Sequence, residues 1–227
     1  MFVQLALAAA LAGPAAAPAE AAPRTVLVVS EARGFVHDSI PAARAALQRL
    51  DGAEIDVRDV AAQDLTAARL RGADAVVFAV TTGDLPVDRP ALRRFVRRGG
   101  GLAGFHSATD TFESWPAWER LIGGRFDHHE EPGATETALV TVPGHPAVAG
   151  VPARFRMREE WYLHEPGVAR RARVLVRWGA ERRPLVWVRS PGRGRVFYDA
   201  LGHFPATWQD PRQEALVRSG LRWVLRL

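Results

Sequence analysis

Residues 101–112 read Gly-Leu-Ala-Gly-Phe-His-Ser-Ala-Thr-Asp-Thr-Phe, and this stretch decides which fold the sequence predicts. Residues 102–105 form a short apolar run, typical of a strand that is buried on both faces. The run ends on His106, which small and hydroxylated residues follow. Open α/β sheets bind ligands at the carboxyl ends of their strands. We therefore expect His106, Ser107 and Asp110 to lie where such a fold does its chemistry.

The segments before this stretch alternate between strand and helix patterns. Strands are predicted at residues 25–30, 54–57 and 75–80, and helices at 42–50, 65–71 and 90–98. Ser39 and Asp88 are typical N-cap residues, and each is followed two positions later by a proline. Alternating strands and helices with short connections predict a doubly wound α/β fold with a mostly parallel sheet.

The C-terminal half follows a different pattern, with more strands and fewer helices. A helix is predicted at residues 115–122, strands at 136–142, 174–178, 185–188 and 195–198, and a final helix from Asp210-Pro211 to about residue 225. The length of 227 residues suits one α/β domain better than two. We therefore expect one domain whose parallel sheet is extended by additional C-terminal strands.

The first 22 residues differ in composition from the rest of the chain. Residues 2–11 are apolar, and Ala19-Glu20-Ala21 resembles a signal-peptidase cleavage site. The apolar run is too short for a good membrane span, so no stable membrane insertion is expected. The prediction is a signal peptide at 1–22, a domain at 23–227, and export to the periplasm or the exterior. A disordered leader or a misplaced start codon is the alternative.

Composition and missing motifs exclude several classes of function. The chain has no cysteine, which excludes disulfides, cysteine-ligated zinc and thiol nucleophiles. The net charge is +5 and every basic residue is arginine, but the arginines are dispersed and accompany no base-reading motif. Nucleic acid is therefore not an expected partner. The chain also lacks the nucleophile elbow of ordinary α/β-hydrolases, a P-loop and a zinc-protease motif.

Three of the seven histidines occupy comparable positions in the predicted fold. His37, His106 and His203 each follow a predicted strand, at what should be its carboxyl end. If these strands are parallel neighbours, the three imidazoles point into one crevice. Imidazole can serve as an acid, a base or a metal ligand near neutral pH. The alternative is that these histidines cap helices and tie loops together.

Two further clusters combine carboxylates with imidazoles or aromatic rings. Residues 127–131 read Asp-His-His-Glu-Glu, which has the ligand density of a site for a divalent metal such as zinc. Because adjacent side chains point apart in an extended segment, at most one of His128 and His129 would bind it. Glu159 and Glu160 precede Trp161 and Tyr162, a combination that suits sugar hydroxyls and apolar sugar faces. An ordinary amphipathic edge segment is the alternative for this second cluster.

Several ordered motifs make the chain resemble the ThuA-like, or trehalose-utilisation, family over nearly all of residues 24–227. Within this resemblance, His129 rather than His128 matches the histidine that follows the family's Gly-Gly-x-Phe segment. The motifs are Gly34-Phe-Val-His-Asp-Ser-Ile40, Gly100-Gly-Leu-Ala-Gly-Phe-His-Ser-Ala-Thr-Asp110, Gly123-Gly-Arg-Phe-Asp-His-His129, His145-Pro-Ala147, Glu160-Trp-Tyr162 and Gly194-Arg-Val-Phe-Tyr-Asp-Ala-Leu-Gly-His203.

The resemblance has consequences for both fold and chemistry. The family is similar to class I glutamine amidotransferases, which implies a flavodoxin-like sheet. In those enzymes a cysteine occupies the elbow at which this chain has His106. Because the chain has no cysteine, amidotransferase chemistry is excluded. The resemblance implies carbohydrate metabolism instead, in particular that of disaccharides and 3-keto sugars.

These observations lead to one main hypothesis and two rivals. The main hypothesis is a sugar-acting hydrolase, lyase or isomerase in which His106, His37 and His203 are catalytic. A divalent metal such as zinc is a candidate cofactor, with His129 as its ligand. The residues predicted to bind a small-molecule sugar are Ser107, Asp110, Glu160 and Tyr162. The first rival is a non-catalytic carbohydrate- or partner-binding module on the same fold. The second is a structural metal protein.

Overall fold

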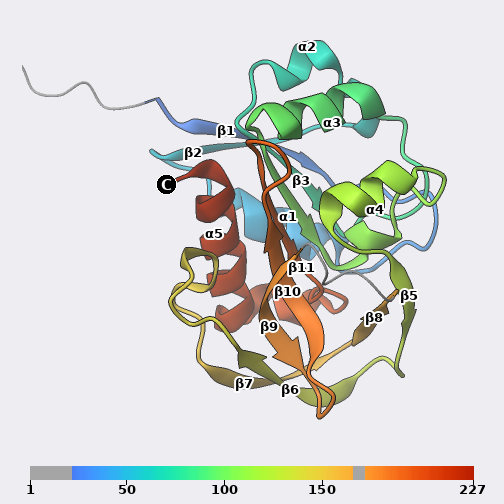
Figure 1. The fold of residues 1–227 in the computed structure, drawn as a ribbon, viewed down its shortest axis with the longest axis vertical. Helices are drawn as coiled ribbons and strands as arrows, with labels where there is room; N and C mark the ends of the chain where they lie inside the picture. Colours follow the sequence, from blue (N-terminus) through green and yellow to red (C-terminus); the bar gives the residue numbers. More distant parts are fainter. Residues whose placement is uncertain (1–21, 166–171) are drawn as a thin grey trace, which may run out of the picture.

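The computed structural model describes residues 22–165 and 172–227. Within these residues nine strands form one sheet in the order β2-β1-β3-β4-β11-β10-β9-β6-β7 (Figure 1). Their bounds are β1 Arg24–Val29, β2 Ile55–Asp59, β3 Ala75–Ala79, β4 Gly101–Phe105, β6 Ala134–Val140, β7 Arg154–Glu159, β9 Arg173–Trp178, β10 Arg183–Arg189 and β11 Arg195–Asp199. A separate antiparallel pair joins β5, Phe126–His129, to β8, Tyr162–His164.

The large sheet has a parallel half and an antiparallel half. Strands β2, β1, β3, β4 and β11 pair in parallel, whereas β10, β9, β6 and β7 continue the sheet through antiparallel pairs. The predicted fold, a mostly parallel flavodoxin-like sheet with additional C-terminal strands, is confirmed. Apolar side chains fill β1, β3 and β4, which therefore run through the centre of the core.

Three strands were not predicted from the sequence. Strand β7 alternates arginine with apolar residues and buries every second side chain, so its pattern carries a usable strand signal. Strands β5 and β8 contain four and three residues and are defined by pairing with each other. Local sequence carries little information about strands of this length, because their partners are distant in the chain.

Helices cover both faces of the parallel half, as a doubly wound fold requires. The helices are α1 Ile40–Gln48, α2 Ala67–Leu70, α3 Arg89–Arg98, α4 Pro116–Ile122 and α5 Pro211–Leu225. A Cβ on Gly101 would lie 3.1 Å from Val224 of α5, whereas one on Gly104 would lie 2.7 Å from Ile122 of α4. Since odd and even residues of a strand face opposite sides, α5 and α4 pack on opposite faces of β4 (Figure 1).

The helix starts agree with the sequence in two cases of three. The Asp88 carboxylate accepts a hydrogen bond from the Ala91 amide at 3.0 Å, and that of Asp210 accepts one from Arg212 at 2.9 Å. Ser39 stands at the N-cap of α1, but its hydroxyl makes no capping hydrogen bond. Pro41 occupies the first turn of α1 as expected.

The N-terminal segment lies almost wholly outside the described residues. Residues 1–21 of the predicted signal peptide belong to this part, so its cleavage and the export of the chain stay predictions. Among the residues that the structure does describe, no helix combines the length and the apolar character needed to cross a bilayer.

Asp199, the last residue of β11, gives the fold a pH-dependent stability. Its side chain is fully buried, and burial raises its pKa to about 7, although the Leu201 amide donates to it at 3.1 Å. The folded chain thus keeps this proton up to about pH 7, whereas the unfolded chain releases it near pH 3.8. The contribution of Asp199 to stability therefore falls as the pH rises between these two values.

Substituting Asp199→Asn is expected to remove this dependence. Between about pH 5 and about pH 8, the unfolding free energy of the variant should rise by about 2–3 kcal/mol relative to that of the wild type. Urea denaturation of both proteins across this range measures the difference. Asp64→Asn, at an exposed position, is the control. A difference that stays constant with pH would contradict a protonated, buried Asp199.

Candidate active site

His106 occupies a strained turn at the carboxyl end of β4. Its φ is +51°, in the left-handed region that residues other than glycine seldom adopt. The Tyr198 hydroxyl donates to the carbonyl of His106 at 2.6 Å and holds the turn. Gly104 lets α4 approach closely, because a Cβ there would lie 2.7 Å from Ile122. A sharp turn that presents a side chain after a strand is the elbow that the resemblance implies at this position.

The imidazole of His106 is fully buried, and its contacts define its proton positions. Nδ1 lies 3.0 Å from the Ala200 carbonyl, which can only accept, so Nδ1 donates this hydrogen bond. In the neutral ring Nε2 then carries a lone pair. That atom lies 3.1 Å from Nε2 of His37, 3.3 Å from the Tyr162 hydroxyl and 3.3 Å from Oε2 of Glu160.

His37 and His203 join His106 from two other loops. His37 follows β1, and β3 lies between β1 and β4 in the sheet, so its loop crosses the end of β3. Thr82, just after β3, holds this loop by donating to the Phe35 carbonyl at 2.8 Å. The ring centroid of His37 lies 4.7 Å from that of His106 and 5.2 Å from that of His203. The three histidines predicted to converge therefore do so.

Glu160 lies at the centre of these imidazoles. Its Oε2 is 3.3 Å from Nε2 of His106 and 3.0 Å from Nδ1 of His203. Its other oxygen, Oε1, is 3.3 Å from Nε2 of His129. The carboxylate of Glu160 therefore contacts three imidazoles, and its predicted role as a sugar ligand stays a prediction.

Glu159, the neighbouring carboxylate, has a different and structural position. Its side chain is fully buried and accepts hydrogen bonds from the amides of Gly202 and His203, both at 3.0 Å. It also accepts from the Thr207 hydroxyl at 2.7 Å and from the Glu160 amide at 3.2 Å. Glu159 thus anchors the loop that carries His203 to the segment that carries Glu160.

Burial and charge shift three pKa values in this cluster. Burial acts to raise the pKa of Glu160, but contacts with His106 and His203 outweigh it and hold this pKa well below its ordinary value. Burial, followed by the charges of His106 and His203, lowers the pKa of His37 to about 3. Burial and the Glu160 charge raise the pKa of Tyr162 well above its ordinary value. At neutral pH, Glu160 is therefore ionised, His37 is neutral and Tyr162 keeps its proton.

The aromatic residues after Glu160 face the protein interior. Trp161 is fully buried and its Nε1 donates to the Ala134 carbonyl at 2.9 Å. The ring of Tyr162 lies between those of His106 and Phe126, with centroids 4.5 Å and 4.4 Å away. These rings are enclosed by protein side chains, so neither offers a free face for stacking on a sugar. The Tyr162 hydroxyl lies 3.3 Å from Nε2 of His106.

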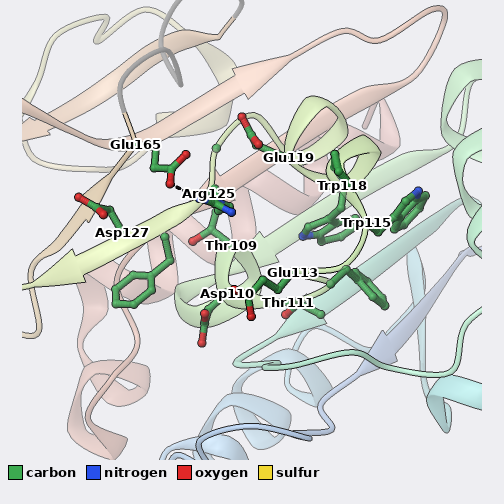
Figure 2. Close-up of a pocket in the computed structure, with 14 residues that line it drawn as sticks. Thr109, Asp110, Thr111, Glu113, Trp115, Trp118, Glu119, Arg125, Asp127 and Glu165 are labelled. Carbon is green, nitrogen blue, oxygen red and sulfur yellow. Dashed lines mark hydrogen bonds and ion pairs between the residues drawn. The ribbon is translucent and has the colours of Figure 1, made fainter.

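Ser107 and Asp110, the other predicted sugar ligands, make no hydrogen bond or ion pair with these imidazoles in the described residues. Ser107 is buried, and among the described residues its hydroxyl has no hydrogen-bond partner. Asp110 is exposed and lines a pocket of about 340 Å³. Figure 2 shows this pocket with Trp115 on one side and Asp127 and Glu165 on the other, where Glu165 pairs with Arg125. Phe126 also lines it and contacts Tyr162, so this pocket borders the histidine cluster.

The adjacent His128 and His129 point to different partners, as the sequence predicted. His128 lies 2.9 Å from the Asp127 carboxylate and is largely exposed, whereas His129 contacts Glu160. The atoms best placed to hold a metal ion come from His37, His106, His203 and Glu160, since one ligand atom from each lies within 4.8 Å of the others. His129 stands next to this group, and its assignment as a ligand stays a prediction.

Sequence reasoning missed two residues that build the site. Tyr198 supports the His106 turn, and Glu159 was not distinguished from Glu160. A signal for Tyr198 exists, because it lies in the buried strand β11 beside β4, at the register position opposite Gly104. No local signal separates the two glutamates, because their roles depend on a loop more than 40 residues away.

Comparisons with known proteins agree with this architecture. The ThuA family model, described as trehalose utilisation, matches residues 25–224. A ThuA-like protein from Bacteroides uniformis has a TM-score of 0.77 at 20% identity, covering 92% of this chain and 95% of that one. A second, from Parabacteroides merdae, has a TM-score of 0.71 at 20% identity, with coverage of 89% and 90%.

A more distant similarity involves part of a larger enzyme. The cold-adapted β-galactosidase from Rahnella sp. R3 has a TM-score of 0.64 at 15% identity, covering 91% of this chain but 32% of that one. At such identities these structures show a shared fold. No curated protein sequence matches the chain. Since the family model spans most of its length, the chain belongs to the ThuA family of trehalose utilisation.

Proposed function

We propose that this chain is an enzyme of carbohydrate metabolism that moves a proton on a disaccharide or 3-keto-disaccharide. The observation that carries the proposal is the convergence of His37, His106 and His203 on the carboxylate of Glu160. This cluster lies at the carboxyl ends of the parallel strands, where open α/β sheets bind ligands. The description of the family, trehalose utilisation, supports a disaccharide as the class of substrate.

The contacts of His106 suit it to act as the general acid or base. The Ala200 carbonyl fixes the proton on Nδ1, so Nε2 of the neutral ring is free to accept one from a substrate. A sugar hydroxyl or a carbon next to a ketone would supply that proton. The negative charge of Glu160, 3.3 Å away, would stabilise the imidazolium that forms. The protonated Tyr162 hydroxyl could donate to an oxygen that gains charge.

Two aromatic rings near the cluster support sugar binding. Phe35 is 65% exposed, and its ring centroid lies 4.7 Å from that of His37. The ring of Phe204 lies 4.7 Å from that of His203, whose side chain is 18% exposed. An apolar sugar face can stack on such rings, which is the role that the sequence suggested for Tyr162. We expect the substrate to approach from the side of His203.

Substituting His106→Asn tests the proposal. Asparagine tolerates the left-handed backbone at this position better than alanine does, so the elbow should persist. Trehalose and 3-keto-trehalose are incubated with each protein, and cleavage, elimination or isomerisation is followed by NMR. The loss of an acid–base group is expected to slow turnover by about 100-fold to 10,000-fold. The matched control is His128→Asn, since His128 is largely exposed and contacts Asp127.

The outcomes separate the main hypothesis from its rival. Unchanged turnover in His106→Asn, with the variant folded, would remove His106 from the chemistry. Saturable binding of both sugars without conversion of either by the wild type would instead favour a non-catalytic binding module.

A further inference from the structure

We infer that His37, His106, His203 and Glu160 form a binding site for one divalent cation of the zinc type. The inference rests on the residues of the proposed function, and it can be tested without any sugar. Because Nε2 of His106 cannot hold an ion and accept a substrate proton at the same time, the acid–base role proposed above belongs to the metal-free site. The four side chains each place one ligand atom within 4.8 Å of the others. This set differs from the one that the sequence favoured, in which His129 was the metal ligand.

Three of the separations between the four ligand atoms are close to those of a coordination sphere, and all of them lie within 4.8 Å. Nε2 of His37 and Nε2 of His106 are 3.1 Å apart, and Nε2 of His106 is 3.3 Å from Oε2 of Glu160. Nδ1 of His203 is 3.0 Å from the same oxygen. Around a tetrahedral zinc ion with bonds of about 2.0–2.1 Å, ligand atoms lie about 3.3 Å apart. Small shifts of these side chains would therefore admit the ion.

The orientation of the His106 imidazole also favours a cation. Metal-binding histidines usually donate their second ring N–H to a carbonyl or carboxylate. His106 does so through Nδ1 to Ala200, which turns its Nε2 toward His37. Nδ1 of His203 is close to Glu160 but lacks hydrogen-bond geometry. A cation bound between these side chains would accept the lone pairs of Nε2 of His106 and Nδ1 of His203, which the present contacts satisfy poorly.

Charge supports the same conclusion. The Glu160 side chain is 5% exposed, and ionised groups are rarely buried without a partner. In the described part of the chain, its ion-pair partners are His106, His129 and His203, and no arginine is among them. A divalent cation would compensate the carboxylate, while His129 would contact Oε1, the carboxylate oxygen that does not face the ion.

The donor atoms indicate which cation to expect. Three imidazole nitrogens and one carboxylate oxygen suit zinc and related transition metals, whereas calcium and magnesium prefer oxygen ligands throughout. Because the side chain of His203 is partly exposed, the ion would have access to solvent on one side. A substrate oxygen or a water molecule would have to bind there as a fifth ligand, an expansion of coordination that catalytic zinc sites also undergo.

The test is a direct measurement of metal binding by the full chain, produced without a histidine tag. The protein is treated with a chelator, dialysed and titrated with zinc chloride by calorimetry. Cobalt chloride is added in parallel, because four-coordinate cobalt absorbs strongly in the visible range. We expect one equivalent of either metal per chain. His37→Gln and His203→Gln should each weaken zinc binding by about 100-fold or more, and His128→Gln should leave it unchanged.

Each outcome bears on the inference. Absence of saturable binding in the wild type, or equal affinity in the double variant His37→Gln/His203→Gln, would overturn it. Binding that only His128→Gln weakens would assign the metal to the surface pair with Asp127 and would overturn it as well. Circular dichroism confirms that each variant is folded, and Glu160→Gln replaces any variant that is not. Metal binding without sugar turnover would leave this inference standing while the proposed function failed.

Discussion

Glu160→Gln is expected to lower turnover by about 100-fold or more while the chain stays folded. Glutamine has nearly the same shape as glutamate but carries no charge. Oε2 of Glu160 lies 3.3 Å from Nε2 of His106 and 3.0 Å from Nδ1 of His203, so the substitution removes the charge that both imidazoles face. An imidazolium that forms during the reaction would then lose its stabilising partner in a buried site.

The measurement is the initial rate on the best substrate of the sugar series, with circular dichroism on the same samples. Asp127→Asn is the matched control, because Asp127 is a nearby carboxylate whose histidine partner, His128, lies on the surface. Full activity of Glu160→Gln would show that the carboxylate only fills space between the histidines. Equal losses in both variants would point to a general effect of charge on the substrate.

Glu159→Ala should cause a large loss of stability. The side chain is fully buried and accepts hydrogen bonds from three backbone amides and the Thr207 hydroxyl. Removing it leaves several buried donors without an acceptor, each at a cost of about 1–3 kcal/mol. We expect the free energy of unfolding to fall by about 3–5 kcal/mol. Glu159→Gln keeps one acceptor oxygen and should lose less.

Urea denaturation of both variants measures this effect. Glu214→Gln is the control, because Glu214 pairs with Arg218 on the surface of α5, and such pairs contribute about 0.3–0.5 kcal/mol. A loss below about 1 kcal/mol in Glu159→Ala would mean that water replaces the carboxylate at these donors. The adjacent glutamates therefore have separable effects, one on activity and the other on stability.

The sequence predicted the parallel half of the fold well for a physical reason. Strands β1, β3 and β4 are buried on both faces, so they form continuous apolar runs that are easy to recognise. The pair β5 and β8 was missed because its strands are short and depend on each other. Strand β7, Arg154–Glu159, alternates exposed and buried residues, but its three arginines made the segment look polar, and it was not predicted as a strand.

The candidate site was predicted in part. The positions of His37, His106 and His203 after strands indicated their convergence, because strand ends meet at one edge of a parallel sheet. The sequence could not show that Tyr162 is enclosed between His106 and Phe126. That arrangement arises from the pairing of β5 with β8, which is a tertiary property.

The turn at His106 also limits how this protein can adapt to new substrates. Its backbone is held by Tyr198 and its ring by the Ala200 carbonyl, so the imidazole is oriented before any ligand arrives. Binding then requires little reorganisation at the reacting atom, which favours fast chemistry on a narrow range of bond positions. Changes in substrate size must be accommodated by the side chains that surround the histidine cluster. Directed evolution of altered specificity would therefore begin at Phe35, Val36 and Phe204, not at the elbow.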